Sequence, residues 1–154
     1  MTEKEPIKDG LVEEFYDNGQ LMLKENYKNG ELDGLYEEFY ENGQLKRRGT
    51  WTRAGKDGLE EKFFPNGQIK YRGMYINGSA EGTHEDYMKE DSLERIVSNY
   101  KDNMYNGLYE QFYENGQLER RGNFYEDEEV GSWEYFDENG KKTATLTEDF
   151  PDNW

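Results

Sequence analysis

The sequence predicts an all-β fold, an open single-layer antiparallel β-meander built from six β-hairpin repeats of about 24 residues each. First, the dipeptide Asn-Gly recurs at 18–19, 42–43, 66–67, 115–116 and 139–140, in steps of 24, 24, 49 and 24 residues. Second, large apolar and polar residues alternate on both sides of these dipeptides, which is typical of a strand–turn–strand unit. Third, no stretch of useful length shows the spacing of an amphipathic helix.

The repeats follow one another without a linker, so we expect a single repeat domain over 1–154. The units start near glycines and span 10–33, 34–57, 58–81, 82–106, 107–130 and 131–150. Short connections such as 28–33 permit only neighbouring antiparallel strands. About twelve strands, spaced about 4.8 Å apart, would span roughly 55 Å.

The turn of each hairpin decides which side chains share a face. A two-residue Asn-Gly loop would pair Tyr40 with Leu45, whereas a three-residue loop pairs Tyr40 with Gln44 and Phe39 with Leu45. We expect the three-residue loop because it collects the apolar side chains on one face, and burying one of them is worth about 1.5–3 kcal/mol. In unit two that face holds Leu35, Phe39, Leu45 and Trp51, and the other holds Tyr36, Tyr40, Lys46, Arg48 and Thr50. The same apolar set recurs as Leu11, Phe15, Leu21 and Tyr27, as Leu59, Phe63, Ile69 and Tyr75, and as Leu108, Phe112, Leu118 and Phe124.

Two units break the pattern. Unit four lacks the Asn-Gly turn and carries a one-residue insertion between Leu93 and Tyr100. A bend or bulge, a partner site and neutral drift are three interpretations of this break, and we favour the bend or bulge. Unit six loses the aromatic residue of its second strand and ends in EDFPDNW (148–154), which is typical of a repeat that caps an array.

Composition limits the classes of protein that the chain can represent. A net charge of −16 with only 32% hydrophobic residues is typical of disorder, but the aromatic residues, 16% of the chain, recur at fixed repeat positions as a thin sheet requires. The acidic balance disfavours nucleic acid and anionic lipid and favours a basic partner. The chain has no cysteine, no apolar run of the ~20 residues that a membrane span needs, and no secretory signal, so we expect a cytoplasmic protein.

The repeated residues resemble a known family. FYENGQL (39–45) and YKNGELDG (27–34) are similar to the MORN repeat in its bacterial variant, and the resemblance runs from about Gly10 to Lys142, with a departure in unit four. The resemblance implies single-layer β-sheets that serve as interaction platforms. It also implies possible roles, since many stand-alone bacterial members are labelled antitoxins or immunity proteins, and eukaryotic relatives are linked to phospholipid membranes.

The sequence gives little support to catalysis. His84 is the only histidine, and it lies in the irregular unit, where we expect a solvated or turn residue. A single-layer sheet offers a groove at best, whereas catalysis needs a base, an orienting partner and a nucleophile that converge in a pocket. The acidic run 126–129 lacks the alternating ligand spacing of a calcium loop, so we expect a solvated loop. We therefore predict no enzyme, no metal site and no cofactor.

A ladder of glutamates is the most informative set. Glu13, Glu37, Glu61, Glu85, Glu110 and Glu134 occupy the same position in all six units, on the face expected to be apolar. The three-residue loop would place Arg47 and Arg120 opposite Glu37 and Glu110, and Leu23, Tyr71 and Ala144 opposite Glu13, Glu61 and Glu134. Two interpretations stay open: the glutamates hold neighbouring strands in register, or they form an acidic–aromatic groove that receives basic side chains.

These features predict a non-enzymatic protein-binding module. The most specific form is an antitoxin or immunity protein that neutralises a basic toxin by direct binding. A structural scaffold or self-assembling repeat protein is the alternative, because an open sheet has two free edges, and peripheral membrane binding is a third possibility that the negative charge disfavours. The expected contact residues are Glu37, Phe39, Trp51, Glu61, Phe63, Glu85, Tyr87, Glu110 and Phe112.

Overall fold

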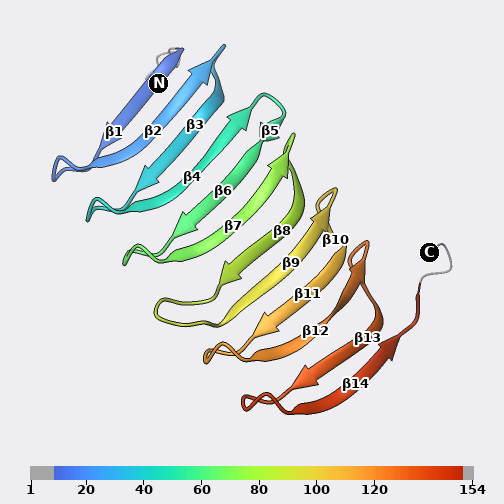
Figure 1. Cartoon of the computed structure of the whole chain (residues 1–154). Helices are drawn as coiled ribbons and strands as arrows, with labels where there is room; N and C mark the ends of the chain where they lie inside the picture. Colours follow the sequence, from blue (N-terminus) through green and yellow to red (C-terminus); the bar gives the residue numbers. More distant parts are fainter. Residues whose placement is uncertain (1–8, 151–154) are drawn as a thin grey trace, which may run out of the picture.

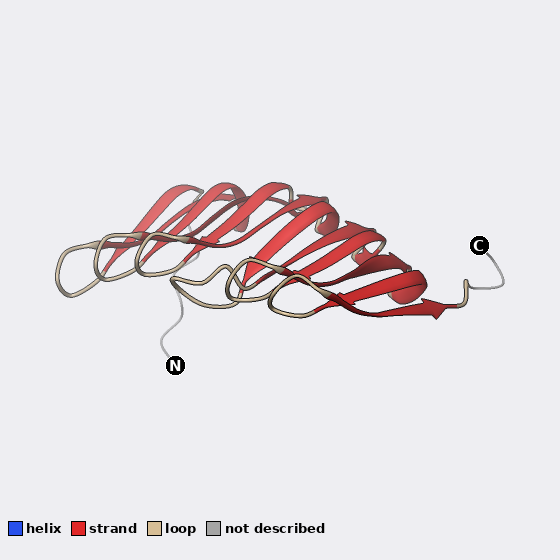
Figure 2. Ribbon diagram, turned by 60° about the horizontal axis from the view of Figure 1, so that its bottom comes forward, coloured by secondary structure: helices blue, strands red, loops and turns tan. Residues whose placement is uncertain are grey.

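The chain forms one open antiparallel β-sheet and no helix over residues 9–150, the part that the computed structural model describes. The strands follow one another in chain order as a meander, so the predicted all-β fold is confirmed (Figure 1). Figure 2 shows a curved single layer with neither face covered by another element. The fourteen strands are β1 (Gly10–Phe15), β2 (Leu21–Lys28), β3 (Glu31–Phe39), β4 (Leu45–Thr52), β5 (Gly55–Lys56), β6 (Gly58–Phe63), β7 (Ile69–Ile76), β8 (Ser79–Tyr87), β9 (Arg95–Lys101), β10 (Met104–Tyr105), β11 (Gly107–Phe112), β12 (Leu118–Tyr125), β13 (Glu128–Phe136) and β14 (Lys142–Glu148).

The hairpin turns have the predicted three-residue loop. In unit two the Tyr40 amide donates to the Gln44 carbonyl over 2.9 Å, and Phe39 lies opposite Leu45. Gly43 has a φ of +83°, a left-handed conformation that a side chain disfavours, so glycine suits this position. The Asn42 side-chain oxygen accepts from the Gln44 amide over 2.9 Å and stabilises the turn.

A β-bulge follows each regular turn and was not predicted. Glu38 lies opposite Arg47, so Lys46 is an extra residue without a partner in β3. Because side chains alternate between faces, one extra residue moves the rest of the strand to the other face. The prediction that Trp51 shares a face with Phe39 and Leu45 is therefore wrong. The same bulge moves Tyr27, Tyr75 and Phe124 to the face of Tyr36, and moves Arg48 and Thr50 to the face of Phe39.

The bulge also corrects the predicted partners of the glutamates. Glu37 lies opposite Arg48 and Glu110 lies opposite Arg121, so neither faces Arg47 or Arg120 as predicted. The other partners within hairpins are Lys24 for Glu13, Arg72 for Glu61 and Thr145 for Glu134, in place of Leu23, Tyr71 and Ala144. A cation therefore lies opposite the glutamate in four hairpins, whereas the unbulged register gave a cation in only two of them.

The two faces of the sheet differ in burial. We call the face that carries Glu37 and Phe39 the ladder face, and the face that carries Tyr36 and Trp51 the aromatic face. Four of the buried side chains lie on the aromatic face at the position of Tyr36, one in each of units three to six: Glu60, His84, Tyr109 and Trp133 are 1%, 4%, 5% and 0% exposed. The prediction that His84 is a solvated or turn residue is wrong, because it lies buried in β8.

Aromatic rings form the shallow core that replaces a globular interior. Ring contacts run without interruption from Tyr71 through His84, Tyr100, Tyr105 and Phe124 to Trp133, with centroids 4.6–5.8 Å apart. Edge and tilted ring contacts at such distances are favourable beyond the area they bury. The packed layer therefore connects units three to six.

Glycines in the second strands make room for this layer. A Cβ at Gly49 would lie 2.3 Å from the Glu60 Oε2 atom, and one at Gly122 would lie 2.2 Å from the Trp133 ring. A Cβ at Gly73 would likewise lie 2.3 Å from the Nδ1 atom of His84. The large side chain of each of these units therefore lies over the glycine of the preceding unit.

Unit four has a longer turn and no bulge. The Met88 amide donates to the Glu94 carbonyl, which leaves a five-residue loop over 89–93. The register from Tyr87 opposite Arg95 to Gly82 opposite Tyr100 is unbroken. Compared with a regular unit, unit four has two more residues in its loop and lacks the one bulge residue. The difference is the single inserted residue. Of the bend or bulge that we favoured for this unit, the bulge is contradicted within the hairpin.

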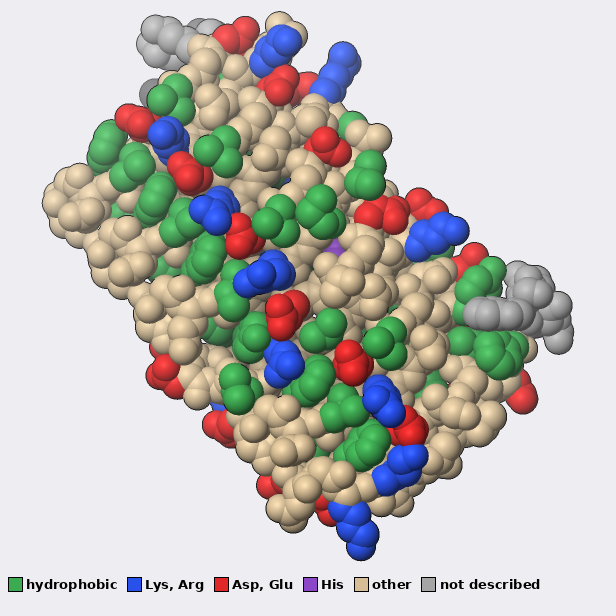
Figure 3. All heavy atoms as spheres, viewed as in Figure 1, with side chains coloured by type: hydrophobic (Ala, Val, Ile, Leu, Met, Phe, Trp, Pro, Cys, Tyr) green, Lys and Arg blue, Asp and Glu red, His purple; other side chains and the backbone are tan. Residues whose placement is uncertain are grey.

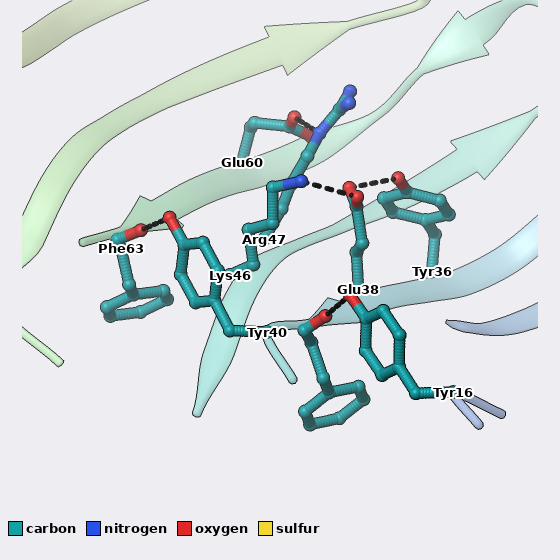
Figure 4. Close-up of polar contacts among 9 residues, drawn as sticks. Tyr16, Tyr36, Glu38, Tyr40, Lys46, Arg47, Glu60 and Phe63 are labelled. Atoms are coloured by element: carbon teal, nitrogen blue, oxygen red, sulfur yellow. Dashed lines mark hydrogen bonds and ion pairs between the residues drawn. The ribbon is translucent and has the colours of Figure 1, made fainter. Parts of the chain in front are cut away.

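Side-chain hydrogen bonds connect successive turns. The Tyr16 and Tyr40 hydroxyls donate to the carbonyls of Phe39 and Phe63, which lie in the next unit, over 2.7 and 2.8 Å (Figure 4). The Asn42 side chain also donates to the Pro65 carbonyl over 3.0 Å. The recurring Tyr-x-Asn-Gly sequence therefore specifies its own turn and its junction with the next repeat.

Candidate functional site

A row of alternating charges crosses the ladder face, and we call it the charge ladder. Cross-strand pairing places its members side by side in the order Glu13, Lys24, Glu37, Arg48, Glu61, Arg72, Glu85, Val97, Glu110, Arg121, Glu134 and Thr145. Figure 3 shows acidic and basic side chains alternating along a diagonal, with hydrophobic side chains on either side. Val97, in the irregular unit four, is the one interior position without a charge.

The arginines of the charge ladder form ion pairs with the glutamate of the following repeat. Arg48 lies 2.8 Å from Glu61, and Arg121 lies 2.6 Å from Glu134. Glu85 has two arginines nearby, Arg72 at 3.9 Å and Arg95 at 3.3 Å. Opposite charges directly across two strands stabilise their pairing. For Glu61, Glu85 and Glu134 the geometry favours the interpretation that glutamates hold strands in register.

Eight of the nine predicted contact residues lie on the ladder face. Their strands, β3, β6, β8 and β11, carry them in matching positions, with each carboxylate beside the aromatic ring two residues further on. Trp51 is the exception, because the bulge places it on the aromatic face. Glu37 and Glu110 form no ion pair within residues 9–150, which distinguishes them from Glu61 and Glu85.

Two apolar rows flank the charge ladder. One row consists of leucines at the same position in four units, Leu11, Leu35, Leu59 and Leu108, with exposed fractions between 44% and 54%. The other contains the phenylalanines at the turn end of each first strand, and arginines of the preceding repeat cover several of them: the Arg95 guanidinium lies 3.8 Å from the Phe112 ring centre. The leucines are therefore more exposed than Phe39, Phe63 and Phe112, which are half-buried.

The aromatic face carries a cluster of cations that the sequence interpretation missed. The buried Glu60 carboxylate pairs with Arg47 at 2.6 Å and Lys56 at 3.2 Å. Lys46, the bulge residue, donates to Glu38 over 2.9 Å, and the Tyr36 hydroxyl also donates to Glu38 (Figure 4). Burial raises the pKa of Tyr36 to about 12, so this hydroxyl stays protonated as a donor.

The described residues contain no cluster of histidine, cysteine and acidic side chains that would hold a metal ion. The run 126–129 does not converge on one point: Glu126 and Asp127 form a turn, and Glu129 pairs with Arg120 at 3.2 Å. Within residues 9–150 no helix has the length and apolar character to span a membrane.

The hairpins form a single sheet, and within residues 9–150 no other element covers either of its faces (Figure 2). This architecture defines the chain as a repeat module with two exposed faces. A family model described as the MORN repeat variant matches residues 8–29, 32–52, 56–77 and 105–127, which is more than half of the chain. The chain therefore belongs to the MORN repeat variant family. The matched segments fall in units one, two, three and five, and the irregular unit four and the terminal unit six are unmatched. A search of curated proteins finds no match.

Proposed function

We propose that this chain is a non-enzymatic protein-binding module that uses its ladder face to bind a basic protein. The observation that carries the proposal is the row of half-exposed leucines beside the charge ladder. Exposed apolar side chains that adjoin one another on a folded protein are typical of an interaction site. Leu59 adjoins Met74, which is 42% exposed, and polar residues such as Asn26 and Thr50 separate the other leucines. The row spans several repeats, so it fits an extended partner surface better than a small ligand.

Charge supports a basic partner. The net charge of −16 steers a cationic protein toward the sheet and raises its association rate. Glu37 and Glu110 are the ladder carboxylates best placed to accept its side chains, because they are half-buried, lie between the apolar rows and form no ion pair within residues 9–150. The only histidine supports the non-enzymatic assignment, since both its ring nitrogens are hydrogen-bonded in a buried position.

The specific form of the proposal is a cytoplasmic antitoxin or immunity protein that holds a basic toxin inactive. It rests on the resemblance of the repeats to bacterial MORN variants together with the negative charge. The double variant Glu37→Lys with Glu110→Lys should lose the partner at low salt. The matched control, Glu126→Lys with Glu128→Lys, makes the same change in net charge at the turn end of β13 and should keep it.

The measurement is capture of basic proteins from the native host on immobilised wild type and on each double variant. The captured protein is then expressed alone and together with this chain. Growth arrest that co-expression relieves supports the antitoxin form. Equal capture by wild type and the Glu37 and Glu110 variant would show that the ladder face is not the contact surface, and a captured protein without toxicity would contradict the antitoxin form alone.

Self-assembly is a second candidate, supported by the residues at the two ends of the sheet. In β1, Val12 occupies the position that Trp133 holds in its unit, and in β14, Leu146 occupies the position of Gly122. Inside the array a large side chain lies over a glycine of the preceding unit. At the two ends of the sheet the equivalent residues are Val12 and Leu146, which are both of medium size. They would pack against each other if β14 of one copy paired with β1 of another. Sedimentation that depends on protein concentration, and is abolished by Leu146→Lys, would support this scaffold function.

A further inference from the structure

A hollow of about 430 Å³ lies on the aromatic face between units three and four. It exists because Ala80, opposite Tyr75, has a small side chain. In the following unit the same register position, opposite Tyr100, is filled by Tyr105, whose ring stacks on Tyr100 with centroids 4.8 Å apart. Larger side chains occupy the equivalent position in the other units, as Lys56 opposite Trp51 and Glu129 opposite Phe124 show. The hollow is therefore the place where this position carries its smallest side chain, and its size is within the range of small-molecule sites.

Aromatic rings form the walls of the hollow, and their polar atoms are already bonded. His84 Nε2 lies 2.9 Å from the Met74 carbonyl, which can only accept, so this nitrogen carries the proton. Nδ1 then accepts from the Tyr71 hydroxyl over 2.8 Å, and Tyr71 in turn accepts from Tyr75 over 2.9 Å. Because this chain of bonds satisfies the three side chains, they offer ring surfaces to a ligand.

Two lysines lie at the rim of the hollow, and their ammonium groups contact rings: Lys62 lies 5.0 Å from the Tyr71 ring centre and Lys70 lies 5.7 Å from that of Phe64. Lys62 and Lys70 line the hollow and also a second depression of about 280 Å³ beside it. Neither forms an ion pair within residues 9–150, whereas the nearby Lys46, Arg47 and Lys56 are bound to carboxylates. Asp86 also lines the hollow but lies beyond ion-pair distance of both lysines. Burial, together with Arg47 and Lys56, lowers the pKa of Lys62, while Glu60 and Asp86 act in the opposite direction. Because burial is the largest cause, a bound carboxylate would replace solvation that the Lys62 ammonium has lost.

We propose that this hollow binds a small aromatic carboxylate, whose ring fills the space that Ala80 leaves and whose carboxylate bonds to Lys62 and Lys70. The ring would continue the stack of the aromatic face, and the charge would supply the missing partner of the two ammonium groups. The site lies on the opposite face from the surface proposed for a protein partner, and it does not depend on that function.

The resonances of the His84 ring report on this site alone, because the chain has no other histidine. We would titrate the full chain with phenylacetate, with phenylacetamide, which has the same ring without the charge, and with acetate, which has the charge without the ring. The expected result is a saturable shift of the His84 ring signals with phenylacetate, and binding at least about tenfold weaker for the other two probes.

Three variants separate the proposed contacts. Lys62→Gln and Lys70→Gln should each weaken phenylacetate binding by about tenfold, since each removes a charge-assisted hydrogen bond. Ala80→Tyr, which introduces the residue type of the equivalent position, Tyr105, should abolish binding by filling the hollow. Lys28→Gln, which removes an exposed lysine elsewhere, should bind as the wild type does.

The proposal is overturned if phenylacetamide binds as tightly as phenylacetate, or if no saturable shift occurs up to about 10 mM probe. Wild-type affinity in both lysine variants would also overturn it. If Ala80→Tyr does not fold, which the dispersion of its spectrum would reveal, the two lysine variants still decide the result, because Lys62 and Lys70 lie at the accessible rim.

Discussion

Single residues set the thickness of the packed layer. A large side chain of one unit lies over a glycine of the unit before it, and the glycine is required by contact distance. Gly49, Gly73 and Gly122 do not have positive φ values, unlike the turn glycines. A side chain at these positions therefore meets a neighbour and causes no backbone strain.

We expect Gly122→Ala to destabilise the protein by about 1–3 kcal/mol, because its Cβ would lie 2.2 Å from the ring of Trp133, whose side chain is fully buried. The measurement is the free energy of unfolding in urea. Asn123→Ala, at the exposed neighbouring position, is the control and should change stability by less than about 0.5 kcal/mol. Equal effects of the two substitutions would show that the layer yields to an added methyl group.

His84 should make stability depend on pH. Burial lowers the pKa of His84 below its ordinary value of 6.5, so the unfolded chain binds the proton more readily than the folded one. The contribution is fully present above pH 6.5 and is lost as pH falls through the lower pKa of the folded state. The variant His84→Tyr carries the residue type that Tyr36 and Tyr109 provide at the same position in units two and five. This variant should not lose stability on acidification through this group.

The check on this prediction is thermal unfolding of wild type and His84→Tyr at several pH values between about 5 and 8, the range in which an unperturbed histidine titrates. The difference in stability between the two proteins should be constant above neutrality and should shift in favour of the variant on acidification. A difference that stays constant over the whole range would mean that His84 titrates normally in the folded protein.

At the scale of the hairpin, the junction between repeats depends on the turn residues. The hydroxyl of Tyr40 donates to the Phe63 carbonyl, and Tyr16 and Tyr113 make the same bond to their next units. We expect Tyr40→Phe to cost about 1 kcal/mol, because the ring packing is kept and one hydrogen bond is lost. Unfolding in urea should show a similar loss for Tyr113→Phe. Additive losses in the double variant are expected, since the two junctions share no partner.

The turn could be predicted from the sequence and the bulge could not. Asn-Gly and the positions of Phe39 and Leu45 together specify a three-residue loop, since only that loop puts both side chains on one face. Lys46 resembles any other strand residue, so nothing marks it as the extra one. Without the bulge, Trp51 and Arg48 were each assigned to the wrong face. The recurrence of glycine at 49, 73 and 122 was the available signal, because a strand interior has glycine where another group approaches closely.

The candidate sites were predictable to different degrees for the same reason. The glutamates and the aromatic residues of the ladder face lie in the first strand of each hairpin, which precedes the bulge. The alternation of side chains along that strand therefore predicts their face correctly. The hollow at Ala80 depends on how side chains from neighbouring strands pack around a small residue, and the alternation of residue types does not specify that packing. The partners of Glu61 and Glu85 come from neighbouring strands whose register the bulge changes.

Over the whole molecule, the aromatic layer is unevenly distributed along the array. The continuous ring contacts begin at Tyr71 and end at Trp133. Strands β1 to β3 contain no buried residue, whereas β11 to β13 contain Tyr109, Gly122, Val130 and Trp133. In a repeat array the stability of each unit depends on its own contacts and on its nearest neighbours, so units can open separately.

We therefore expect amide hydrogen exchange to be slowest in β11 to β13, faster in β2 and β3, and fastest in the edge strands β1 and β14. Every residue of β14 is exposed, and in β1 only Val12 is half-buried, so opening these strands uncovers little apolar surface. Exchange followed by mass spectrometry of peptides, on the full chain at one pH, measures this order. Trp133→Ala should bring the protection of β11 to β13 down toward that of β2 and β3, because it removes the end of the ring series. Equal protection of β2–β3 and β11–β12 in the wild type would contradict the prediction. It would show that the charge ladder and the turn hydrogen bonds, which both regions share, determine local stability more than the aromatic layer does.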